Sequence, residues 1–190
     1  MTRREAIEYD NALKDAMKQV SLQYGMGESN GSYIVDNFIT VWPADARKGM
    51  IFFGEDSVSY KAGNVKIDLK KALIAGLELA ASVNQPESIL NYIQLIIVCV
   101  FFIEKSVRQD IGKLEARIVY FLHEKGAYDT GVEEERVICE MQECYQQKEG
   151  KALEREKIVD ATNFLCEVKA IDLFEGKIYL KEKVFGKVDK

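Results

Sequence analysis

An uninterrupted run of nine apolar residues, Leu95–Ile103, constrains the fold of this chain more than any other feature. Polar residues lie just before the run, and Glu104-Lys105 follows it directly. A helix that crosses a membrane needs about 20 apolar residues, so this run is too short to do so. Pro86 suits the first turn of a helix, because the N–H that proline lacks would have no partner there. We therefore expect a helix from Pro86 to Val107 that is apolar nearly all round and is surrounded by other elements.

The chain before this helix begins with another helical pattern. Over residues 3–24, six apolar residues recur at helical spacing on one face: Tyr9, Leu13, Ala16, Met17, Val20 and Tyr24. We expect this helix to end at Gly25 and a flexible loop to follow over Gly25–Gly31. The loop does not have the pattern of a phosphate-binding loop, because it lacks a Gly-Lys-Ser/Thr ending and follows a helix, whereas that motif follows a strand.

Short extended segments come next. Ser32–Val41 is rich in β-branched and aromatic residues, which favour strands. Three further strand candidates are separated by Gly, Asp and Asn: Met50–Phe53, Ser57–Tyr60 and Val65–Ile67. Ala62-Gly63-Asn64 predicts a hairpin turn between the last two, and the whole predicts a small, mostly antiparallel sheet. Asp68 then suits the N-cap of a helix that runs to Val83.

Three more helical segments and a hairpin make up the C-terminal half. They are Lys113–Glu124, Val132–Lys148, Glu154–Lys169 and the hairpin Ile171–Phe185. Thr130 and Glu133 have the spacing of a capping box at the start of the second helix. Glu175-Gly176 predicts the turn of the hairpin.

This order of three helices and a β-hairpin resembles that of the winged-helix superfamily. The stretch Glu154–Leu180 resembles the third helix, the exit and the wing of such domains, and the resemblance covers residues 107–186. The sequence therefore predicts an α+β chain in three parts. Residues 1–85 form an N-terminal α/β region, in which a small antiparallel sheet lies between two helices. Residues 86–107 form a central buried helix, and residues 108–190 form a winged-helix-like bundle with its hairpin.

The sequence contains no pattern typical of a catalytic or metal site. Four cysteines lie in apolar, helical contexts and none forms a CxxC pair: Cys99, Cys139, Cys144 and Cys166. A zinc site needs thiolate and imidazole ligands at short spacings, and the single histidine, His123, is far from these thiols. We expect buried thiols in a reducing compartment, no metal and no cofactor. His123 has no neighbouring nucleophile in the sequence, so we expect a structural or exposed residue.

The N-terminus bears on location. Its first residues turn acidic at once and lack the apolar segment of a signal peptide. Together with the short apolar run, this predicts a cytoplasmic protein without a membrane partner.

The second strand of the hairpin is the first candidate interaction surface. Residues two apart in a strand share a face. Lys177, Tyr179, Lys181 and Lys183 therefore point the same way, opposite Ile178, Leu180 and Val184. This basic face could lie along a phosphate backbone. A solvated hairpin also needs charge for solubility and for protection of its edge, so the pattern alone favours neither interpretation.

The third helix of the bundle is the second candidate surface. Its side away from the apolar stripe offers Arg155, Glu156, Asp160, Asn163 and Glu167. Glu154–Lys169 contains three basic and four acidic residues. Phosphate contacts supply most of the affinity for DNA, and an acidic helix would be repelled from the groove. The balance therefore favours a protein partner.

Two hypotheses follow. The preferred one is a non-enzymatic protein-binding adaptor in a bacterial-type multiprotein system. The alternative is a DNA-binding transcriptional regulator that contacts phosphates through its wing, with residues 1–85 as a dimerisation or sensing module. A homodimer is compatible with both. Trp42, the only tryptophan, is either a core residue at a sheet edge or an anchor for a partner, and its large apolar area favours the core.

Overall fold

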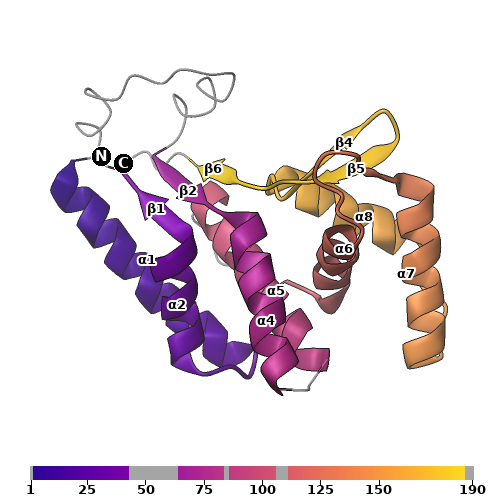
Figure 1. The fold of residues 1–190 in the computed structure, drawn as a ribbon, viewed down its shortest axis with the longest axis horizontal. Coiled ribbons are helices and arrows are strands. Elements are labelled where there is room, and N and C mark those ends of the chain that lie inside the picture. Colours follow the sequence, from indigo (N-terminus) through magenta and orange to yellow (C-terminus); the bar gives the residue numbers. More distant parts are fainter. Residues whose placement is uncertain (1, 43–63, 84–85, 106–110, 187–190) are drawn as a thin grey trace.

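The computed structural model describes residues 2–42, 64–83, 86–105 and 111–186, which form a mixed α+β fold (Figure 1). Its helices are α1 Arg3–Gln23, α2 Glu28–Phe38, α4 Leu69–Val83, α5 Pro86–Lys105, α6 Lys113–Glu124, α7 Glu134–Glu149 and α8 Arg155–Glu167. Its strands are β1 Ile39–Val41, β2 Val65–Ile67, β3 Val132–Glu133, β4 Ile171–Phe174, β5 Lys177–Leu180 and β6 Val184–Gly186.

Helix α5 is the core of the molecule, as the apolar run predicts. It begins at Pro86, and every residue from Tyr92 to Phe101 is buried. Helices α1, α4 and α6 and strand β6 all contact it. None of the described helices is long and apolar enough to cross a membrane.

Helix α1 agrees with its prediction, whereas the segment after it does not. Thr2 and Glu5 form a capping box at the start of α1. The predicted loop over Gly25–Gly31 and the predicted strand over Ser32–Val41 are wrong: α2 begins at Glu28, and only Ile39–Val41 is extended. Packing overrides strand propensity here.

The contacts of α2 show why it is a helix. Its buried residues Ile34, Val35 and Phe38 have helical spacing. Gly31 lies so close to α1 that a Cβ on it would be 2.3 Å from the carbonyl oxygen of Met17. Only glycine permits this approach of the two helices.

A three-stranded antiparallel sheet joins the N-terminal half of the chain to the C-terminal strand β6. Its order is β1-β2-β6, with Val65 opposite Gly186 and Ile67 opposite Val184. The predicted hairpin over Ile171–Phe185 is therefore too long. Its second strand ends at Leu180, and the chain crosses to pair with β2 (Figure 1). Val184 is buried in this position, which stabilises the crossing.

The C-terminal half contains a second sheet of order β3-β5-β4. Helices α6 and α8 agree with the predictions to within two residues at each end. Helix α7 begins at Glu134, two residues later than predicted, because Val132 is buried opposite Ile178 in the strand pair β3–β5. The predicted Thr130–Glu133 capping box is consequently wrong: Glu133 is the N-cap and makes no side-chain capping bond.

Polar contacts fasten the two halves together. The Tyr24 hydroxyl accepts a hydrogen bond from the backbone N–H of Ile111 at 2.8 Å, and Gln94 donates to the Ile111 carbonyl at 2.6 Å. Lys70 on α4 forms an ion pair with Glu182, between β5 and β6. In the first sheet, Val65–Ile67 is a strand as predicted, whereas Met50–Phe53, Ser57–Tyr60 and most of the predicted turn lie outside the described residues.

Candidate functional site

Strand β5 of the hairpin contains only two of the four residues of the predicted basic face. Lys177 and Tyr179 lie on one side of β5, and Ile178 and Leu180 are buried on the other. Lys181 and Lys183 follow the strand, in the connection to β6. The Tyr179 ring lies against the backbone of Gly131, where a Cβ would approach it to 2.9 Å. The ring is thus part of the packing of the small sheet.

Three cations of this surface form ion pairs with carboxylates. The pairs are Arg155–Glu135, Lys177–Glu133 and Lys181–Asp172. We call them the α8–hairpin ion pairs, because their cations lie on α8, on β5 and directly after β5. The first is bidentate, and the hydrogen bond from Arg155 lowers the pKa of Glu135. Two of the three bring together residues 20 or more positions apart, so no local sequence pattern indicates them. Without rearrangement, few cations of this surface are available to phosphate.

The polar side of α8 is exposed as a whole. Arg155, Glu156, Asp160, Asn163 and Glu167 all face solvent. The opposite side is buried at Ile158, Ala161 and Leu165, and the half-buried Phe164 stacks on Phe101 of α5 with ring centroids 5.7 Å apart. The five polar residues form one surface beside β4, which α8 contacts.

The tip of the hairpin exposes two large apolar side chains that the sequence analysis missed. Leu173 is 43% exposed and Phe174 is 62% exposed. They end β4 directly before the tight turn Glu175-Gly176, whose two residues both have left-handed backbone angles. Asp172 and Glu175 place acidic groups on either side. The sequence signal for this exposure is the Leu-Phe pair directly before the predicted turn. Residues at the tip of a hairpin extend beyond the core, so apolar side chains there stay exposed.

Trp42 and His123 lie outside the surface formed by α8 and the hairpin. Trp42 is half-buried after β1, and its backbone N–H donates to the Asn64 carbonyl at 2.8 Å. His123 is half-buried and hydrogen-bonded to the Tyr128 hydroxyl. Burial lowers the pKa of His123, an effect that nearby Glu124 opposes and Lys70 reinforces.

The cysteines do not share one environment. All four are in helices, as predicted, but only Cys99 is fully buried; Cys139 is exposed and the other two are half-buried. Burial raises the pKa of the Cys99 thiol. Within the described parts of the chain, no three His, Cys, Asp or Glu side chains come together to hold a metal ion.

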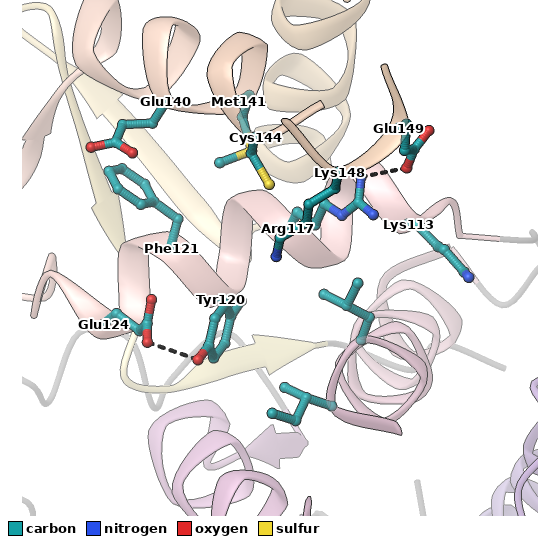
Figure 2. A pocket seen from close by; sticks show the side chains of 12 residues that line it. Lys113, Arg117, Tyr120, Phe121, Glu124, Glu140, Met141, Cys144, Lys148 and Glu149 are labelled. Carbon is teal, nitrogen blue, oxygen red and sulfur yellow. Dashed lines mark hydrogen bonds and ion pairs between the residues drawn. The ribbon is translucent and has the colours of Figure 1, made fainter. Parts of the chain in front are cut away.

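A cleft of about 480 Å³ lies between α5, α6 and α7 (Figure 2). Its apolar lining comes from all three helices: Ile89, Leu90, Phe121, Met141 and Cys144. This volume is within the range of ligand sites in proteins. No residue of α8 or of the hairpin lines the cleft, so it is separate from the surface described above.

Charges in the cleft are partly separated by sign. Figure 2 shows Glu124 and Glu140 toward one end, and the bases Lys113, Arg117 and Lys148 toward the other, where Glu149 lies beside Arg117. The antiparallel course of α6 and α7 produces this arrangement, since bases begin α6 and end α7. No local sequence pattern indicates this arrangement, because the two helices contribute residues up to 36 positions apart.

Several of these charges are already bound within the protein. Arg117 donates to Glu149 at 2.8 Å and stacks over the Tyr145 ring at 4.5 Å. The Tyr120 hydroxyl donates to Glu124 at 2.7 Å, and burial together with this hydrogen bond raises the pKa of Tyr120 to about 12.

Family models, curated proteins and solved structures were compared with the chain, and none of them matches it.

Proposed function

We propose that this chain is a non-enzymatic adaptor that binds a protein partner through a winged-helix-like module formed by α6, β3, α7, α8, β4 and β5. The order helix, strand, two helices and hairpin, with the sheet order β3-β5-β4, supports this description of the module. The docking surface consists of the polar side of α8 and the tip of the hairpin.

The observation that carries the proposal is the chemistry of this surface. Its cations Arg155, Lys177 and Lys181 are each paired with a carboxylate, while Leu173 and Phe174 at the tip are exposed. Exposed aromatic residues are frequent anchors of protein interfaces. Acidic groups around the tip favour a partner with an apolar pocket and a basic rim.

DNA binding through the wing is the alternative function. Lys177 and Tyr179 share one face of β5, and Lys183 next to it is exposed. Ion pairs at a surface are weak, so phosphate could displace their carboxylates. Such binding would weaken steeply as salt is added.

A photo-reactive amino acid at position 174 tests the proposal in an extract from the source cells. The same group at the equally exposed Ile7 on α1 is the control. A partner captured from position 174, in the presence of nuclease and not from position 7, is then purified and titrated. We expect Phe174→Ser to weaken its binding by about 30-fold, the effect of losing a buried anchor.

The result that contradicts the proposal is equally defined. Unchanged affinity of Phe174→Ser for every captured protein, together with salt-sensitive binding of duplex DNA that Lys177→Glu impairs, would favour the DNA-binding function. A loss of binding by Phe174→Ser would not result from unfolding, because Phe174 is largely exposed and its replacement changes stability by only about 0.5 kcal/mol or less.

A further inference from the structure

The cleft between α5, α6 and α7 contains charged groups that no opposite charge of the described residues neutralises. Glu140 and Lys148 both lie on α7, and among the described residues neither forms an ion pair within 4 Å. By contrast, Arg117 forms an ion pair with Glu149, whereas Glu124 accepts a hydrogen bond from the neutral Tyr120 hydroxyl and keeps its negative charge. Glu140 and Lys148 are therefore an unpaired acid and an unpaired base toward opposite ends of the cleft, and Glu124 adds negative charge at the Glu140 end (Figure 2).

The spacing of these two charges sets the length of a complementary ligand. Eight residues separate Glu140 from Lys148 along α7, which corresponds to about 12 Å or a little over two helical turns. Between them, Met141 and Cys144 of α7 face Phe121 of α6 across the apolar part of the cleft (Figure 2). A complementary ligand has a cation at one end, an anion at the other and apolar groups between.

We infer that this cleft is a second docking site, which takes an amphipathic helical segment of a partner protein with a basic and an acidic side chain two turns apart. An amphipathic helix places residues i and i+7 on one face, about 10 Å apart, with apolar residues i+3 and i+4 between them. The basic residue pairs with Glu140 and the acidic residue with Lys148, while the apolar residues cover the half-buried Ile89, Leu90 and Cys144 of the lining. Docking of such a helix in a groove between helices is a common mode of recognition.

Charge complementarity selects this occupant. A nucleic acid would be repelled at the Glu140 end, and a uniformly basic peptide at the Lys148 end. The site is also independent of the hairpin tip, which lies on other elements. With both sites, one chain would hold two partners at once, as an adaptor requires. The inference about the cleft does not depend on binding at the hairpin, because no hairpin residue lines the cleft.

Three stapled helical peptides with the same apolar residues test the inference. They differ only at two positions seven residues apart, which are Lys and Glu, Lys and Lys, or Glu and Glu. Each is titrated onto the ¹⁵N-labelled full chain, and the amide signals of Phe121, Met141 and Cys144 are followed. We expect the Lys/Glu peptide to shift these signals and to bind about fivefold more tightly than either like-charged peptide, the effect of one solvent-exposed ion pair.

A charge-reversal variant makes the test specific. Lys148→Glu is expected to lose the preference for Lys/Glu and to bind the Lys/Lys peptide more tightly than the unaltered chain does. Phe174→Ser, in the hairpin, is expected to leave all three affinities unchanged, so failure at one site is distinguishable from failure at the other. Equal affinity for the three peptides, shifts confined to other elements, or no shift with any peptide would each overturn the inference.

Discussion

Glu135 on α7 holds Arg155, the first residue of α8, through two hydrogen bonds between carboxylate and guanidinium. The bond between Nη1 and Oε2 is 2.7 Å long. This bidentate geometry is also the one by which arginine grips phosphate. The arginine at the start of α8 therefore already has the partner that a DNA backbone would otherwise supply.

The first prediction concerns this masking of positive charge. We expect the triple variant Glu133→Gln, Glu135→Gln, Asp172→Asn to release the three cations of the α8–hairpin ion pairs and to gain weak affinity for duplex DNA at low salt. Each cation that contacts a phosphate contributes about −0.9 to the slope of log K against log salt concentration, so the slope should approach about −2.7. Fluorescence anisotropy across a salt series measures it.

A charge-matched control separates local from overall charge. Glu8→Gln, Asp15→Asn and Glu28→Gln add the same net charge on α1 and α2. Equal DNA affinity in both triple variants would show that the α8–hairpin ion pairs mask nothing specific. Strong binding by the unaltered chain would contradict the prediction more directly.

The second prediction concerns Gly76 in the middle of α4. A Cβ at this position would lie 2.2 Å from the Tyr92 ring, which is almost fully buried. Gly76→Ala should therefore lower the free energy of unfolding by about 1–3 kcal/mol, the usual cost of overpacking. In the Tyr92→Leu background the ring is absent, and the same change should become neutral or stabilise by up to about 1 kcal/mol through helix propensity. Urea unfolding of the four proteins tests whether the sign reverses.

The third prediction is that the two halves unfold together. Strand β6 from the C-terminal end pairs with β2, and Val184 is buried there. Trp42 fluorescence and far-UV circular dichroism should therefore give coincident transitions. Val184→Ala should shift both by the same amount, about 2 kcal/mol.

Exposed Ile74 on α4 provides a control for this loss of apolar surface. Ile74→Ala should change stability by about 0.5 kcal/mol or less. A Trp42 transition that separates from the dichroism transition in Val184→Ala would instead indicate two independent domains.

The fourth prediction concerns pH. Burial lowers the pKa of His123 below its ordinary value of about 6.5, so the unfolded chain takes up this proton at a higher pH than the folded chain does. The resulting contribution to stability is complete above about pH 6.5 and is lost as pH falls toward the lowered pKa. We expect a lower melting temperature at about pH 5.5 than at about pH 7.5.

The variant His123→Gln isolates this effect. His123 is the only histidine, so no other imidazole contributes in this window. The difference in melting temperature between the two pH values should shrink in the variant. An undiminished difference would assign the pH dependence to carboxylates, of which Glu124 is the nearest to His123 in the sequence.

Local sequence determined the elements whose signals are strong within one turn or one strand. The apolar run Leu95–Ile103 predicts a buried central helix, and α5 is that helix. Glu175-Gly176 predicts the turn of the hairpin, and both residues adopt the left-handed angles that such a turn needs. These predictions succeed because a tight turn and a helix buried on all sides each depend on the types of consecutive residues.

Tertiary structure decided the rest. Segment 28–38 is a helix because Gly31 allows it to lie against Met17, a contact that strand propensity does not reveal. Strand β6 leaves the hairpin because β2, more than 100 residues earlier, offers it a partner. Likewise, the cleft and the ion pair Glu135–Arg155 exist only where separate helices meet. Charges and hydrogen-bonding groups select partners by distance in space, and only the packed core brings residues so far apart in the chain within reach.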